Sequence, residues 1–207
     1  MRKNILACKV ALVGSSGVGK TCIIERFTKN TYDEEKVSEA TVTSSYSEKK
    51  INFKDYNKTI CFNIWDTAGQ EVYRALAKNF YKNASIGILV YDITRRITFE
   101  DIQTFWSKEL KENGEENMVL ALVGNKYDLF AKAEIKEEEA KKYAESINAL
   151  FILTSCKDSV GIDDLFYECG VQYLANNNMI KVKPKDNFVL GNNEIDTDKK
   201  IKKRRFC

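Results

Sequence analysis

The sequence predicts an α/β fold in which helices cover both faces of a mostly parallel sheet. Strands buried on both faces read as nearly continuous apolar runs, and helical segments between them are typical of parallel connections. At 207 residues and 43% hydrophobic, the chain has the size of about one domain plus a tail, at roughly 150 residues per domain. The predicted strands are Ile5–Val13, Thr59–Trp65, Ile86–Ile93, Met118–Val123 and Leu150–Thr154. The predicted helices are Lys20–Lys29, Ala75–Tyr81, Phe99–Glu112, Lys136–Ser146 and Ile162–Asn176.

A sixth strand is predicted at the edge of the sheet. The stretch Thr41–Phe53 is polar and alternating, and the turn-like residues Lys54–Lys58 separate it from the next apolar run. This pattern indicates an antiparallel hairpin, because one face of an edge strand meets solvent. The sheet is thus expected to have six strands, of which the edge strand is antiparallel to its neighbour.

Periodicity stops after Asn176. The remaining residues are polar and end in a basic run, Lys199–Arg205, followed by Phe206 and Cys207. We therefore expect a folded domain over 1–176 and a flexible tail over 177–207.

Composition excludes several classes of protein. The net charge is +3, from 33 Lys and Arg against 30 Asp and Glu, which argues against a polycation that coats nucleic acid. There is no histidine, so histidine-based zinc sites and Ser-His or Cys-His triads are excluded. The six cysteines are scattered, as in a reducing compartment, and no apolar run reaches 18 residues. Lys9 interrupts the first apolar run, which argues against a signal peptide.

The first motif predicts a phosphate-binding loop. Residues 14–21 read Gly-Ser-Ser-Gly-Val-Gly-Lys-Thr, between a predicted strand and a predicted helix. Glycines let the backbone curl so that several N–H groups face one anion, and the helix N-terminus adds partial positive charge. Lys20 is expected to reach the β- and γ-phosphates, and the Thr21 hydroxyl to ligate Mg²⁺. ATPases and small kinases share this loop, so it leaves the nucleotide open.

The second motif follows the Thr59–Trp65 strand. Asp66 at a strand end can hold Mg²⁺ through water, and Gly69 allows a backbone N–H to approach a γ-phosphate. Gln70 can orient an attacking water. Taken alone, Asp66 also fits a turn former.

The third motif predicts a guanine site. Asn125-Lys126-Tyr127-Asp128 follows the Met118–Val123 strand, and a carboxylate can accept both N1–H and the exocyclic amine of guanine. Asn125 is expected to tie this loop to the phosphate loop, with the Lys126 stem over the ring. Ser155-Cys156-Lys157, after the last strand, offers backbone N–H groups for the guanine O6.

In this order the motifs resemble those of the Ras-like small GTPases, and of the Rab family in particular, over about residues 5–175. Rab-like segments are Trp65-Asp-Thr-Ala-Gly-Gln-Glu71 and Leu89-Val-Tyr-Asp-Ile-Thr94. The resemblance is closest to the early-endosomal Rabs. The resemblance implies the fold of a P-loop NTPase G domain. It implies catalytic roles for Lys20, Gly69 and Gln70, and Mg²⁺ ligation by Thr21, Thr41 and Asp66. It implies nucleotide contacts from Ser15, Ser16, Gly17, Val18, Gly19, Lys20, Thr21, Cys22, Tyr32, Thr41, Asp66, Gly69, Asn125, Lys126, Asp128, Ser155, Cys156 and Lys157.

The resemblance also implies surfaces for partners. Tyr46, Trp65 and Phe80 match the aromatic effector triad of the family, and Cys207 beside the basic run matches a prenylation site. The expected partners are an exchange factor, a GTPase-activating protein, effectors, and prenylation and extraction factors. The chain is expected to be a monomer in the cytoplasm, reversibly attached to the cytosolic face of an intracellular, endosomal membrane, without a nucleic-acid partner.

Several positions depart from the family pattern. The segment from Tyr32 to Thr41 is about two residues longer than usual, so Thr43 remains an alternative Mg²⁺ ligand. Val72 replaces a usual basic residue and Cys156 a usual alanine. Rabs usually carry two terminal cysteines, whereas Cys207 is single and outside a C-a-a-X box.

We therefore interpret the chain as a GTP/GDP switch that regulates vesicle traffic. No arginine is clearly placed to act in cis, so intrinsic hydrolysis is expected on the order of 10⁻⁴–10⁻³ s⁻¹, with a partner's arginine accelerating it. Two alternatives remain, a binding module without catalysis and a P-loop kinase or ATPase. Single-turnover hydrolysis and GTP-over-ATP competition separate them.

Overall fold

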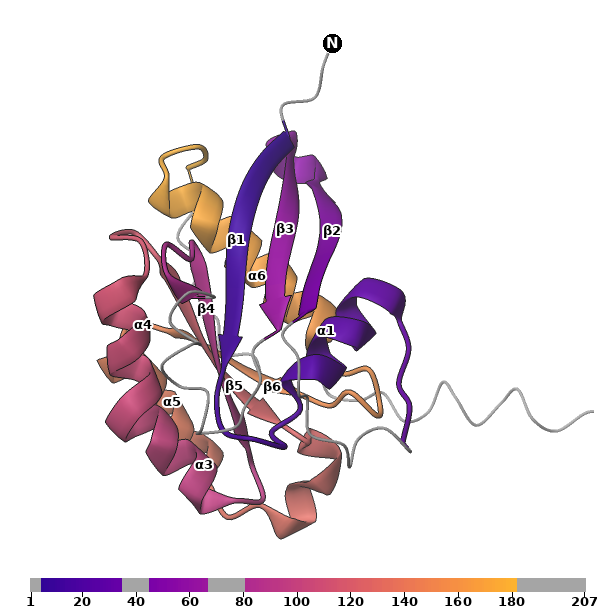
Figure 1. The fold of residues 1–207 in the computed structure, drawn as a ribbon, viewed down its shortest axis with the longest axis vertical. Helices are drawn as coiled ribbons and strands as arrows, with labels where there is room; N and C mark the ends of the chain where they lie inside the picture. The colour runs from indigo at the N-terminus through magenta and orange to yellow at the C-terminus, as the bar shows by residue number, and fades with distance from the viewer. Residues whose placement is uncertain (1–4, 35–44, 67–80, 182–207) are drawn as a thin grey trace, which may run out of the picture.

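A six-stranded sheet forms the centre of the molecule (Figure 1). The computed structural model describes residues 5–34, 45–66 and 81–181. Each strand is parallel to its neighbours except β2, which runs antiparallel to β3 at one edge. In spatial order the strands are β2 (Ser45–Phe53), β3 (Lys58–Asp66), β1 (Ile5–Val13), β4 (Ile86–Asp92), β5 (Val119–Asn125) and β6 (Leu150–Thr154). The predicted fold class, including the antiparallel edge strand, is confirmed.

Helices cover both faces of this sheet (Figure 1). Helices α1 (Lys20–Lys29) and α6 (Ile162–Asn176) pack on one face, where their buried side chains share a core with inward-facing residues of the strands. Helices α3 (Arg96–Asp101), α4 (Ser107–Asn113) and α5 (Glu137–Ser146) contribute to a second core on the other face. Strands β4 and β5 are therefore buried along their whole length, which explains their continuous apolar sequence.

Three phenylalanines join α1, β3 and α6 at the centre of the first core. The rings of Phe27 and Phe166 stack with centroids 3.6 Å apart, and Phe62 meets both rings edge-on, at 6.1 Å and 5.9 Å. All three side chains are at most 1% exposed. Stacked and edge-on pairs stabilise beyond the area that they bury, so this cluster fixes α1, and with it the loop before α1, against the sheet.

Replacing Phe166 by alanine is expected to lower the free energy of unfolding by about 3–5 kcal/mol, because the cavity lies among rings that cannot collapse into it. Urea unfolding followed by circular dichroism measures the change. Phe130→Ala is the matched control, since the Phe130 side chain is 68% exposed. Equal losses in both variants would contradict this assignment of the core.

Element boundaries differ from the predicted ones in ways that matter for the site. Strand β5 continues to Asn125 and β3 to Asp66, so both polar residues are the last residues of strands. The helix predicted from Phe99 begins at Arg96, and one π-helical turn, Ile102–Trp106, separates α3 from α4. Of the helix predicted at 75–81, only its last residue is described. Ile5, predicted to be buried, is 51% exposed.

Residues that directly follow Asn176, the predicted end of the domain, contact the first core. The N–H of Met179 donates to the Leu174 oxygen at 2.9 Å, and Met179 and Ile180 pack against the first core. Residues 182–207, most of the predicted tail, lie outside the described residues.

The carboxyl ends of the five parallel strands meet at one edge of the sheet, the lower edge in Figure 1. Open parallel sheets bind ligands at this edge, where the connecting loops converge. Within the described ranges, no helix combines the length and the apolar character needed to cross a membrane.

Candidate functional site

The loop between β1 and α1 has a backbone that only glycine accommodates at two positions. Gly14 has φ +145° and a Cβ there would lie 2.2 Å from the Val90 oxygen, while Gly19 has φ +97° and a Cβ would lie 2.3 Å from Nδ2 of Asn125. Close packing of the loop against β4 and β5 thus requires both glycines. Helix α1 begins directly after Gly19 without a side-chain cap or an acidic residue in its first turn, an arrangement that favours an anion.

Lys20 lies inside this loop. Its Nζ donates to the Gly14 oxygen at 2.8 Å and to the Ser15 oxygen at 3.0 Å, and the residue is 5% exposed. Burial lowers the pKa of Lys20 to about 8, and the nearby Asp66 carboxylate opposes that shift. A buried ammonium group whose partners are neutral carbonyls is suited to bind an anionic ligand.

Thr21 and Asp66 bring oxygen ligands together beside Lys20. The Thr21 hydroxyl donates to Oδ2 of Asp66 at 2.8 Å. Oδ1 of Asp66 is buried and has no hydrogen-bond partner among the described residues. Burial raises the pKa of Asp66, although the Thr21 hydrogen bond and the Lys20 charge oppose this. A hydroxyl beside a carboxylate with an unpaired buried oxygen fits the oxygen-ligand chemistry of Mg²⁺.

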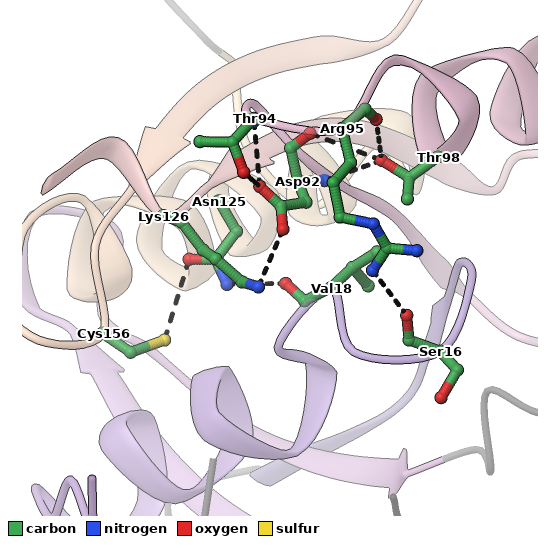
Figure 2. A network of polar contacts seen from close by, with 9 residues as sticks. All are labelled: Ser16, Val18, Asp92, Thr94, Arg95, Thr98, Asn125, Lys126 and Cys156. Carbon is green, nitrogen blue, oxygen red and sulfur yellow. Dashed lines mark hydrogen bonds and ion pairs between the residues drawn. The ribbon is translucent and has the colours of Figure 1, made fainter. Parts of the chain in front are cut away.

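Asn125, the last residue of β5, connects the phosphate loop to the end of β6. Its Nδ2 donates to the Val18 oxygen at 2.8 Å (Figure 2). Its Oδ1 accepts the Thr154 hydroxyl at 3.0 Å. The predicted tie between this loop and the phosphate loop is therefore present. Asn125 is 2% exposed, so breaking either bond would leave a buried polar group unpaired.

Asp128 and the loop after β6 face each other. The Ser155 hydroxyl donates to Oδ1 of Asp128 at 2.7 Å, and the Ser155 N–H donates to the Val160 oxygen at 3.0 Å. The Ser155 amide is thus already used inside the protein, which favours Cys156 and Lys157 as amide donors to a ligand. Arg26 of α1 holds this loop, since its Nε donates to the Cys156 oxygen at 2.8 Å. Burial raises the pKa of the Cys156 thiol to about 12, so it is a neutral thiol at neutral pH.

Lys126 has a partner that the sequence did not suggest. It adopts φ +66°, and its Nζ lies 2.7 Å from Oδ2 of Asp92, a residue 1% exposed at the end of β4. Burial opposes ionisation of Asp92, but hydrogen bonds from Lys126 and Thr94 outweigh it and lower the pKa of Asp92. The pair fixes the direction of the Lys126 side chain at the site.

Tyr32 lies on the side of the site formed by α1. Its ring is half-buried, and the Arg26 guanidinium carbon lies 5.6 Å from the ring centroid. The pKa of the Tyr32 hydroxyl is raised, chiefly by burial and further by the charges of Glu34, Cys22 and Asp128. The effect of Asp128 agrees with a position of Tyr32 near the base loop.

Two members of the aromatic triad lie together. Tyr46 and Trp65 are directly paired across β2 and β3, their ring centroids are 5.3 Å apart, and Tyr46 is 51% exposed. They form an aromatic surface beside the site. Ser15, Ser16, Gly17 and Cys22 lie in the described phosphate loop and the start of α1. Seven other residues of the sequence analysis lie outside the described residues: Thr41, Thr43, Gly69, Gln70, Val72, Phe80 and Cys207.

One arginine without a predicted role contacts the phosphate loop. Nη1 of Arg95 donates to the Ser16 oxygen at 3.2 Å, although the two residues are 79 positions apart (Figure 2). Parallel pairing of β1 with β4 brings the segments after these strands together. The available signal was a basic residue three positions after Asp92, the last residue of β4, but only the strand order gives this position a meaning.

The family model of the Ras family matches residues 9–175. The Ras-related protein Rab-22A of Canis lupus familiaris and that of Homo sapiens are each 42% identical over 160 residues, which cover 77% of this chain and 80% of each relative. The Ras-related protein RABA1i of Arabidopsis thaliana is 43% identical over 164 residues, covering 79% of this chain and 73% of that protein.

The chain belongs to the Ras family, whose members bind GTP and GDP, generally with Mg²⁺, and hydrolyse GTP. More particularly, its similarity to Rab proteins makes it a Rab-like small GTPase, a GTP hydrolase that regulates vesicle traffic. Rab-like GTPases act with regulators and effectors and associate with membranes.

Proposed function

We propose that residues Ser15–Cys22 bind the phosphates of GTP and GDP and that Asn125, Lys126, Asp128 and the loop Ser155–Lys157 bind guanine. The observation that carries this assignment is the hydrogen bond from Asn125 Nδ2 to the Val18 oxygen, at 2.8 Å, which holds the base loop against the phosphate loop. The two halves of one nucleotide would then be bound by one connected structure. Asp128 accepts from the purine, Tyr32 flanks it, and Lys20 binds the phosphates.

Binding of labelled GDP against ATP, with and without Mg²⁺, tests this assignment. We expect GDP to bind and ATP to fail to compete even in large excess, because adenine cannot donate to Asp128 through N1 and a 2-amine. Loss of affinity when Mg²⁺ is removed is expected as well. Preference for ATP would exclude the assignment of the base loop.

The bound cation is proposed to rest on Thr21, Asp66 and Thr41, with Thr43 as the alternative to Thr41. When bound, Mg²⁺ would neutralise part of the negative charge of the phosphates. The protein's own contribution is to hold a hydroxyl and a carboxylate oxygen together, as Thr21 and Asp66 do at 2.8 Å.

Gln70 is proposed to orient the attacking water, and Gly69 to donate its N–H to the γ-phosphate. Replacing Gln70 by leucine is expected to lower single-turnover GTP hydrolysis by about tenfold or more, since phosphoryl transfer depends on positioning of the nucleophile. The affinity for GTP, from titration of a fluorescent analogue, should stay within about twofold. Hydrolysis at the wild-type rate would remove Gln70 from this role.

We further propose that residues 1–176 form the G domain and 177–207 a tail that reaches a membrane. A prenyl group on Cys207 beside the basic run Lys199–Arg205 would supply two membrane signals, and a single lipid anchors only marginally. Mass spectrometry of the protein isolated from its native cells is expected to show a lipid mass on Cys207. An unmodified Cys207 would contradict this proposal.

The proposed partners follow from the same surfaces. An exchange factor and a GTPase-activating protein would act at the site, and effectors would bind the aromatic surface of Tyr46 and Trp65, with Phe80 as its third member. Prenylation and extraction factors would bind the tail. The proposed location is the cytosolic face of an endosomal membrane, occupied reversibly by a cytoplasmic monomer.

A further inference from the structure

The segment after β4 holds the outer side of the phosphate loop. Arg95 donates through Nη1 to the Ser16 oxygen at 3.2 Å, and a Cβ on Gly17 would lie 3.5 Å from the same nitrogen (Figure 2). The guanidinium therefore lies along two consecutive residues of the loop. When loop N–H groups curl toward one anion, carbonyls such as that of Ser16 are turned to the other side.

Arg95 is carried on a rigid turn. The Thr98 hydroxyl donates to the Arg95 oxygen at 2.7 Å and accepts the N–H of Asp92 at 3.1 Å. Thr98 is fully buried and Asp92 is 1% exposed. Asp92 in turn pairs with Lys126, so one connected set of polar contacts joins the base loop to the phosphate loop through Arg95 (Figure 2).

A second contact reaches the neighbouring residue of the loop. The Ser15 hydroxyl donates to Oδ2 of Asp101 in α3 at 2.5 Å, and Ser15 is 6% exposed. Ser15 and Ser16 are thus both tied to the segment from Arg95 to Asp101. Asn125 ties Val18 from the base loop, so the loop is held at both of its ends.

We propose that Arg95 is a positioning residue for nucleotide binding, which acts through the peptide between Ser16 and Gly17. Its guanidinium binds the carbonyl oxygen of this peptide, whose other group is the Gly17 N–H. Hydrogen bonds polarise one another, so a cation on the oxygen makes the N–H a stronger donor to phosphate. The inference rests on the proposed assignment of this loop to the phosphates. Arg95 does not touch the nucleotide in this role, and it acts by slowing nucleotide release.

The test is the dissociation rate of a fluorescent GDP analogue from the full chain, in excess GDP and constant Mg²⁺. Arg95→Ala is expected to release the analogue about fivefold faster, with its association rate within twofold of wild type. Arg95→Lys, which keeps a donor cation, is expected to restore at least part of the slow release. A general loss of structure would not be rescued in this way.

Arg96→Ala is the matched control. Arg96 makes a bidentate pair with Glu139 of α5, both bonds at 2.8 Å, and its Nη2 also donates to the Glu134 oxygen. Arg96→Ala removes the same charge at the position next to Arg95, and it is expected to leave the rate of nucleotide release unchanged. Release from Arg95→Ala at the wild-type rate, or equally fast release from Arg96→Ala, would overturn the proposal. Wild-type protein that binds no GDP would instead overturn the assignment of the loop.

Discussion

Replacing Asp128 by alanine is expected to weaken GDP binding by about 100- to 1,000-fold. The proposed carboxylate accepts two hydrogen bonds from guanine, and bonds to a charged group contribute about 1.5–3 kcal/mol each. The Ser155 hydroxyl, 2.7 Å from Oδ1 of Asp128, would also lose its acceptor. Competition of unlabelled GDP against a fluorescent analogue measures the affinity.

Asp158→Ala controls for charge at this place, because Asp158 is exposed and its backbone N–H, which alanine keeps, donates to Ser155 Oγ at 3.1 Å. Its affinity for GDP should match the wild type. Asp128→Asn tests the recognition of the base more specifically. The asparagine amide can donate to a purine that carries a carbonyl at C2, whereas the aspartate carboxylate can only accept. We expect this variant to prefer xanthosine diphosphate to GDP. Undiminished GDP binding by Asp128→Ala would exclude a base-reading role for Asp128.

The parts of the fold that follow from local rules were predictable. Continuous apolar runs such as β4 mark strands buried on both faces, and the alternating residues of β2 mark an edge. The tie from Asn125 to Val18 was also predictable, because the carboxyl ends of parallel strands meet at one edge. Each of these predictions needs only a periodicity or a strand direction.

Contacts that depend on strand order and side-chain direction were not predictable. Asp92 and Arg95 meet Lys126 and Ser16 only because β4 lies between β1 and β5, and no motif records that order. Likewise, the Ser155 amide fits a ligand donor in the sequence, but a bridge to Val160 uses it. Tertiary contacts therefore decide which of several locally equivalent groups reaches the ligand.

Replacing Lys20 by methionine is expected to weaken GDP binding by about 100-fold or more. Among the described residues, the buried ammonium donates to two backbone carbonyls of the loop and interacts electrostatically with Asp66. A phosphate is a much stronger partner for it than a neutral carbonyl. Methionine keeps most of the volume and removes the charge, which separates electrostatics from packing. Equilibrium titration with a fluorescent GDP analogue at constant Mg²⁺ measures the affinity.

Lys29→Met is the control on the same helix, where the charge is exposed and pairs with Glu25 at 3.2 Å. An exposed pair of this kind contributes about 0.3–0.5 kcal/mol to stability, so its loss should leave GDP affinity within twofold. If Lys20 instead served only to close the loop, methionine would lower the unfolding midpoint while GDP bound almost as tightly. A large loss of affinity with an unfolding midpoint close to that of Lys29→Met would establish that the buried cation acts on the ligand.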